Sequence, residues 1–107
     1  MPSNTPKRGI PDRFLTFRKL YPQIVEALDA CGSATANAGP MDQKTVELVR
    51  LAIAIGARQE GGVHSHTRRA LEAGATVDEI RQVALLAITS IGFPNAMAAM
   101  SWIEDVV

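Results

Sequence analysis

Apolar residues recur at intervals of three and four along most of the chain, the spacing of one face of an α-helix. The clearest stripe follows Thr76 and comprises Ile80, Val83, Ala84, Ala87, Ile88 and Ile91. Thr76-Val77-Asp78-Glu79 has the form of a capping box, in which each end of the motif bonds to a backbone N–H of the other. We therefore expect a helix here that closes at Gly92, and a last helix that starts near Pro94.

Two central helices are predicted on either side of Gly61-Gly62, which we interpret as a helix end or a hinge. The first runs from about Gln43 to Arg58, with Asp42 as its N-cap. The second runs from about Val63 to Ala73. Apolar residues repeat at helical spacing in both segments.

Near the N-terminus, two short helices are predicted over Pro11–Tyr21 and Gln23–Ala30, because Pro22 interrupts the pattern between them. Small and polar residues without a period predict a loop over Cys31–Pro40. No segment alternates at period two between turn residues, so no sheet is expected. The prediction is an all-α bundle of about five to six helices.

Length and composition limit the classes of protein. The 107 residues suit one domain, over residues 11–107, after a flexible arm over residues 1–10. Eleven basic and eleven acidic residues cancel, which argues against nucleic-acid and membrane partners. The apolar stretches are too short to cross a bilayer. A single cysteine, Cys31, excludes an intrachain disulfide and fits a cytoplasmic protein.

The apolar content also indicates that the chain associates with other copies of itself. Hydrophobic residues make up 47% of the chain but aromatic residues only 5%, and several predicted helices have more than one apolar face. Helices of this kind usually bury their second face against another subunit. A homo-oligomer is expected.

The two histidines, His64 and His66, are the first candidates for chemistry. In an extended segment they would share a face and could chelate a metal, but on a helix they lie about 200° apart. The helical stripe beginning at Val63 favours the second case, so no metal site is assigned. His66 then lies at the edge of the buried stripe, as a catalytic or a merely structural histidine, and His64 is expected at the solvent side or an interface.

Glu47 is the second candidate, since it lies on a helix that is otherwise mostly apolar. Arg50 follows it by one turn, and Arg58 follows by about three turns on the same side. These charges could form a solvated salt-bridged face. A buried carboxylate next to a histidine would instead orient the ring and favour its protonated form, as acid–base chemistry requires. Cys31 has no nearby histidine in the sequence and is not assigned as a nucleophile.

Three segments together resemble the carboxymuconolactone decarboxylase superfamily, which includes the AhpD-type alkylhydroperoxidases. They are Gly39 to Val49, His66 to Ile80 with its Ala-Gly-Ala-Thr motif, and Gly92-Phe93-Pro94. The resemblance extends from about Phe14 to Ile103. It implies an AhpD-like helical fold that assembles as dimers, trimers or hexamers, with the active site beside a subunit interface.

The resemblance also separates two branches. The peroxidase branch has a Cys-x-x-Cys pair seven and four residues before the histidine; these positions are Gln59 and Gly62 here. Thiol peroxidation needs both thiols, so this chemistry is not expected. The family's glutamate, nineteen residues before the histidine, corresponds to Glu47. The chain is thus similar to the decarboxylase branch, which lacks the thiols.

This resemblance implies a lyase or isomerase that acts on a small lactone or carboxylate without a cofactor. It assigns His66 as the general acid, Glu47 as the group that orients it, and Arg50 or Arg58 as the anion-binding side chain. Two alternatives stay open: a non-catalytic oligomer in which Glu47 and His66 form a structural pair, and a redox protein acting through Cys31.

Overall fold

The computed structural model describes residues 5–107, which form six helices and no strand. The helices are α1 (Asp12–Leu20), α2 (Pro22–Ala36), α3 (Gln43–Gly56), α4 (Glu60–Glu72), α5 (Val77–Ile91) and α6 (Phe93–Glu104). This confirms the all-α prediction. Within the described range, no helix has the length and apolar character needed to cross a membrane.

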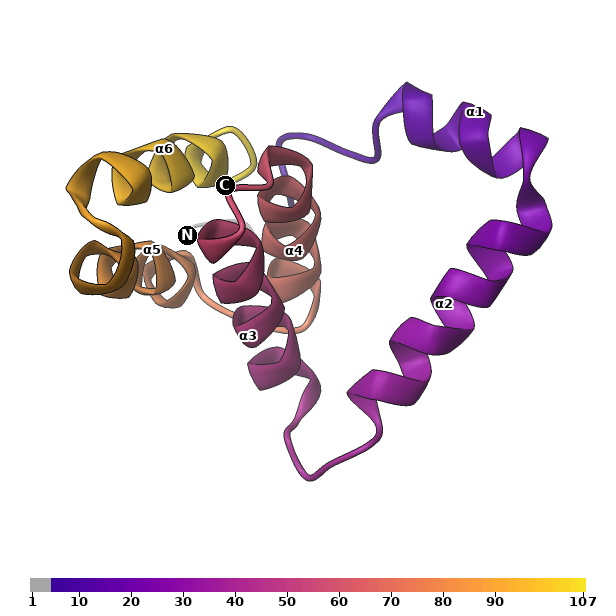
Figure 1. The fold of residues 1–107 in the computed structure, drawn as a ribbon, viewed down its shortest axis with the longest axis horizontal. Coiled ribbons are helices and arrows are strands. Elements are labelled where there is room, and N and C mark those ends of the chain that lie inside the picture. Colours follow the sequence, from indigo (N-terminus) through magenta and orange to yellow (C-terminus); the bar gives the residue numbers. More distant parts are fainter. Residues whose placement is uncertain (1–4) are drawn as a thin grey trace.

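Helices α3 to α6 form the bundle that contains the core (Figure 1). α3 packs chiefly on α4, and α5 packs chiefly on α6. The largest side chains buried between them are Leu51, Leu71, Ile80, Ile103 and Val63. The backbone N–H of Lys7 donates to the carbonyl of Val106 at 2.7 Å, which ties the segment before α1 to the C-terminus. Of residues 1–10, which were predicted to be flexible, residues 1–4 lie outside the described residues.

Helices α1 and α2 extend away from this bundle as a bent arm (Figure 1). Val25 is the only buried residue of the two helices. The arm leaves large apolar side chains exposed, among them Phe14, Phe17, Leu20, Tyr21, Ile24 and Leu28. The two helices are separate, as predicted, but the break lies at Tyr21, one residue before the predicted position, because Pro22 occupies the first turn of α2.

The two predicted N-caps are confirmed. The Asp42 carboxylate accepts from the Thr45 N–H at 2.8 Å at the start of α3. At the start of α5, Thr76 and Glu79 form both bonds of a capping box. Gly92 then separates α5 from α6 with a φ of 89°, a conformation that favours glycine.

The predicted loop over Cys31–Pro40 is wrong in its first part, because α2 continues to Ala36. Its small residues have no apolar period to reveal a helix, but they can remain helical. Thr35 donates its hydroxyl proton to the Gly32 carbonyl at 2.9 Å, and Arg50 of α3 donates to the same carbonyl at 2.8 Å. A cation near the C-terminal end of a helix also interacts favourably with the helix dipole.

The expected break at Gly61-Gly62 is also wrong, because both glycines lie in the first turn of α4. A Cβ atom added at Gly62 would lie 3.1 Å from the Cβ of Ala54, so the glycine allows α4 to approach α3 closely. The break lies earlier. α3 ends at Gly56, two residues before the predicted end at Arg58, which has a φ of 55°.

Candidate active site

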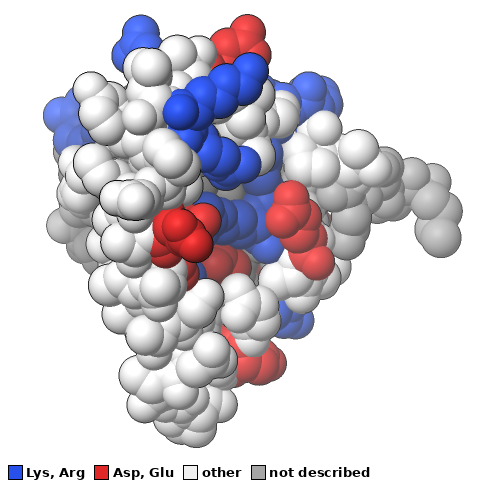
Figure 2. Space-filling view, turned by 90° about the vertical axis from the view of Figure 1, so that its right-hand side faces the viewer, with Lys and Arg blue, Asp and Glu red and all other residues white. Residues whose placement is uncertain are grey.

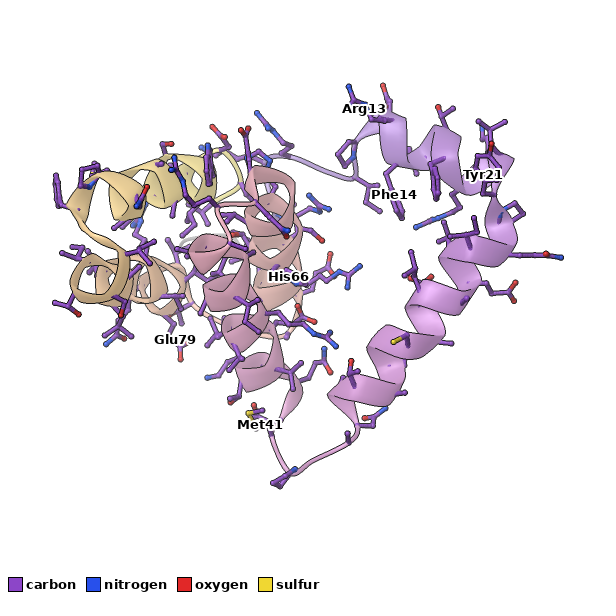
Figure 3. The ribbon with its side chains drawn as sticks, viewed as in Figure 1. Arg13, Phe14, Tyr21, Met41, His66 and Glu79 are labelled. Atoms are coloured by element: carbon purple, nitrogen blue, oxygen red, sulfur yellow. The ribbon has the colours of Figure 1, made fainter. Side chains whose placement is uncertain are left out.

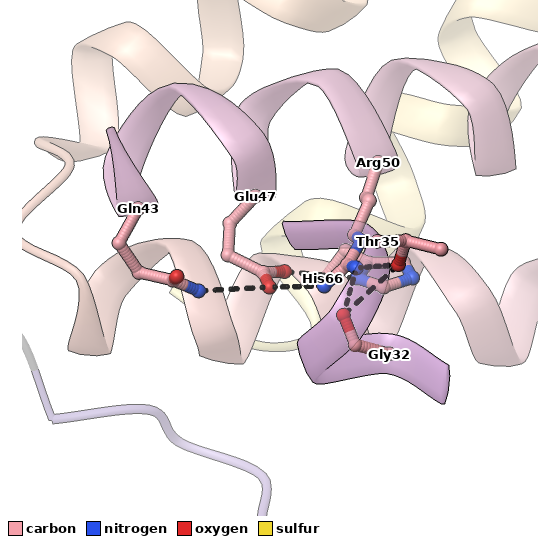
Figure 4. Close-up of polar contacts among 6 residues, drawn as sticks. All are labelled: Gly32, Thr35, Gln43, Glu47, Arg50 and His66. Atoms are coloured by element: carbon pink, nitrogen blue, oxygen red, sulfur yellow. Dashed lines mark hydrogen bonds and ion pairs between the residues drawn. The ribbon is translucent and has the colours of Figure 1, made fainter. Parts of the chain in front are cut away.

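Glu47 is the buried centre of the candidate site. Its side chain projects from α3 and is only 2% exposed. Its oxygens accept from three donors: Arg50 Nη1 at 3.1 Å, His66 Nδ1 at 3.0 Å and Gln43 Nε2 at 3.4 Å (Figure 4). A buried carboxylate needs such partners to offset the loss of its hydration.

His66 comes from α4, on the side of that helix that faces α2 (Figure 3). Its side chain is 23% exposed, which matches the expected position at the edge of the buried stripe. Because Nδ1 faces the Glu47 carboxylate, that nitrogen carries a proton and Nε2 is left for other chemistry. Among the described residues, Nε2 has no hydrogen-bond partner.

Arg50 holds the Glu47 carboxylate and also connects the bundle to the arm. Its Nη1 donates to Glu47, and its Nη2 donates to the Gly32 carbonyl at 2.8 Å and to Thr35 Oγ1 at 2.9 Å (Figure 4). The second predicted arginine, Arg58, is exposed beyond the end of α3 and lines none of the cavities described below. The structure therefore brings Glu47, Arg50 and His66 together and leaves Arg58 apart.

Two cavities open on this group of side chains. The larger, of about 670 Å³, lies between the arm and the bundle and is lined by Glu47, Arg50 and Arg69, among others. The smaller, of about 290 Å³, is lined by His66, Arg50 and Arg69 together with Gln59. Arg69 was not among the predicted site residues. It lies three residues after His66 on α4.

Of the two positions expected for His64, the solvent side is wrong, because the side chain is buried within this chain. Its Nε2 lies 2.9 Å from Oδ2 of Asp105, and its Nδ1 lies 3.5 Å from Arg8. The ligand atoms of Glu60, His64 and Asp105 all lie within 4.8 Å of one another, a spacing that a metal ion could bridge. The guanidinium group against the ring opposes a second cation at this place. His64 and His66 do lie on one helix, so they do not form a shared chelate.

Comparison with known proteins identifies the family of this chain. The sequence profile described as the carboxymuconolactone decarboxylase family matches residues 22–105. The chain belongs to the carboxymuconolactone decarboxylase family. A crystal structure of an apo carboxymuconolactone decarboxylase family protein from Legionella pneumophila superposes with a TM-score of 0.74 at 26% sequence identity, over 88% of this chain and 84% of that one.

Two proteins have sequences similar to this chain, and both are described as uncharacterised. One, from Methanocaldococcus jannaschii, is 28% identical over 83% of each chain. The other, from Haemophilus influenzae, is 38% identical over 49% of this chain, and the match spans 46% of that protein's length. Neither description states a family or an activity.

The peroxidase positions of this carboxymuconolactone decarboxylase family protein hold no thiol. Gln59 is the N-cap residue of α4, and Gly62 lies in its first turn against Ala54. Cys31, the only cysteine of the chain, is exposed on α2. The site thus contains an imidazole, a carboxylate and guanidinium groups, which can move protons and bind anions.

Proposed function

We propose that this protein is a cofactor-independent lyase or isomerase, with His66 as its general acid or base and Glu47 as the group that orients the ring. One observation carries the proposal. The Glu47 carboxylate, whose side chain is only 2% exposed, lies 3.0 Å from Nδ1 of His66. The other ring nitrogen, Nε2, has no partner among the described residues, and His66 lines a cavity. A carboxylate in this position holds the imidazole in one orientation and fixes which ring nitrogen faces the cavity.

In the proposed decarboxylation, the bond between the carboxylate carbon and the ring of a small lactone breaks and carbon dioxide leaves. The electron pair of that bond is delocalised into the conjugated lactone. The imidazolium form of His66 then transfers its Nε2 proton to the carbon that carries the new electron pair. The neutral ring takes up a proton from solvent and returns to the imidazolium form, so one proton is consumed for each carbon dioxide released. In an isomerisation, Nε2 would first accept a proton from one carbon and then return it to another.

Arg50 has a different role in this proposal from the anion-binding role that the family resemblance implied. Its guanidinium group is occupied by Glu47, the Gly32 carbonyl and the Thr35 hydroxyl. We therefore assign Arg50 as a positioning residue that holds the Glu47 carboxylate in place. Arg58 has no role in the proposed site, because it lies apart from the other residues.

Self-association is part of the proposal. Apolar side chains on the arm stay exposed, with exposed fractions of 67% for Leu20 and 62% for Leu28. Many exposed apolar side chains on two neighbouring helices are typical of an interface, and the arm also forms one wall of the larger cavity. We propose that a second copy of the chain covers the arm and limits access of water to the site.

The substitution His66→Gln tests the proposed chemistry. With a panel of small lactones that carry a carboxyl group, we expect carbon dioxide release or isomerisation by the wild type and a loss of about 10²- to 10⁴-fold in kcat in the variant. Arg58→Gln is the control, since it changes one exposed side chain away from the site. Full activity of His66→Gln would overturn the assignment.

A non-catalytic role is the second candidate, and one observation favours it. Arg50 and Gln43 also bond to Glu47, so His66 and Glu47 could form a structural pair only. Histidine NMR discriminates between the two roles. The ring signals of His66 should respond to added lactone acids if the site is catalytic, and should ignore them if the pair is structural.

A further inference from the structure

A second cavity of about 290 Å³ lies between α1 and α4, next to the candidate active site. Three arginines line it: Arg18 from α1, and Arg68 and Arg69 from α4. Figure 2 shows that basic groups gather in the hollow on the arm side of the molecule, with acidic groups at its edges. Glu72 is the only carboxylate that lines this cavity. Three guanidinium groups against one carboxylate leave an excess of positive charge.

The positive charges are not neutralised within the part of the chain that the structure describes. Neither Arg68 nor Arg69 has an ion pair there. Burial and the nearby Arg69 charge lower the pKa of Arg68, whereas Glu72 raises it. An arginine stays charged at neutral pH in any case. The guanidinium of Arg18 lies 5.0 Å from the centre of the Phe14 ring, which holds it at the cavity wall by a cation–π contact.

Arg69 connects this basic cavity to the candidate active site. It lines the basic cavity, the cavity that contains His66 and the cavity that contains Glu47. On α4 it follows His66 by three residues, and side chains at that spacing are neighbours on a helix surface. An anion bound by Arg69 would therefore lie beside the imidazole.

We propose that Arg69, with Arg68 and Arg18 behind it, binds a carboxylate group of the ligand and orients the rest of that ligand toward His66. The proposal rests on the proposed function, because it concerns the same site. Guanidinium groups are suited to this task, since their planar donors match the two oxygens of a carboxylate. Arg50 is less suited to this task, because three of its five N–H donors are already engaged with Glu47, Gly32 and Thr35.

The test measures binding and not turnover. The probe is muconolactone, a five-membered lactone with one free carboxyl group, titrated into ¹⁵N-labelled protein and followed by NMR. Its methyl ester is the matched neutral probe. We expect Arg69→Gln to weaken muconolactone binding by about tenfold or more, because the variant loses charge-assisted hydrogen bonds. Arg68→Gln should weaken it by a few-fold.

Arg58→Gln is the control variant, because it removes the same charge at a site that lines none of the three cavities. It should change the affinity by less than about twofold. The proposal is overturned if Arg69→Gln binds the acid as the wild type does, if Arg58→Gln weakens binding equally, if the methyl ester binds as well as the acid, or if the wild type binds neither.

His66→Gln separates this proposal from the proposed function. The variant should bind muconolactone with near wild-type affinity, since the carboxylate contacts Arg69 and not the ring. Binding that depends on Arg69 together with full turnover by His66→Gln would uphold the anion site and refute the chemistry. Loss of turnover in His66→Gln together with binding that is indifferent to Arg69 would do the reverse.

Discussion

Replacing Glu47 by glutamine removes the charge at the centre of the site and keeps the size of the side chain. The two carboxylate oxygens accept from Arg50, His66 and Gln43, with the side chain 2% exposed. In the variant, one oxygen becomes an amide group that faces these donors. At least one buried donor therefore loses its acceptor, and the guanidinium charge loses its counter-charge.

The magnitude follows from the burial of each partner. Removing one member of a fully buried ion pair costs about 3–5 kcal/mol, and a hydrogen bond to a charged group contributes about 1.5–3 kcal/mol. The side chains of Arg50 and His66 are 22% and 23% exposed, so water can hydrate them in part after the change. We expect Glu47→Gln to lower the free energy of unfolding by about 2–3 kcal/mol.

Urea unfolding, followed by circular dichroism at neutral pH and at one fixed protein concentration, measures this loss. Glu26→Gln on α2 is the matched control, because Glu26 is exposed and none of the recorded ion pairs includes it. The control should change stability by less than about 0.5 kcal/mol. The reasoning is refuted if the two variants unfold at the same urea concentration.

Two further predictions concern a surface pair and the arm. Arg81 donates to both oxygens of Glu104, at 2.6 Å and 3.0 Å, and these bonds lower the pKa of that carboxyl below its ordinary value. Arg81→Gln should lower the Tm slightly relative to the wild type at neutral pH. This difference in Tm should vanish as the solution is acidified through the lowered pKa of Glu104, because a protonated Glu104 gains nothing from the arginine. An equal difference in Tm at neutral pH and below that pKa would contradict this. For the arm, light scattering should give the wild type a mass of at least twice the 11.5 kDa of one chain. A Leu20→Glu, Leu28→Glu double variant should have a mass closer to that of the monomer. A monomeric wild type would refute the proposed self-association.

The sequence predicts best the features that depend on neighbouring residues. The capping box at Thr76 needs only four residues in a row, and the stripe that follows it fills one face of α5. The closeness of Glu47 and His66 was suggested by the family resemblance, because these residues lie nineteen positions apart on two different helices. Local patterns alone would not have paired them.

The failures come from contacts between distant parts of the chain. His64 is buried and its ring contacts Asp105, which lies 41 residues later, and no pattern near His64 indicates this partner. The exclusion of Arg58 depends on where α3 ends, and the place of Arg69 depends on the helices α1 and α2, which form a wall of the cavities around it. Gly61-Gly62 predicts a break because glycine is a poor helix former, yet the close packing of α4 on α3 favours glycine at Gly62.

The central claim is that Nε2 of His66 exchanges protons with the carbon of a bound lactone acid. Incubating the protein with such acids in D₂O and following their C–H signals by proton NMR tests it most directly, because exchange does not require net turnover. We predict protein-dependent loss of a C–H signal next to the carboxyl or lactone carbonyl, retained in Arg58→Gln and abolished in His66→Gln. Exchange at the wild-type rate in His66→Gln, or none with the wild type, would contradict the claim.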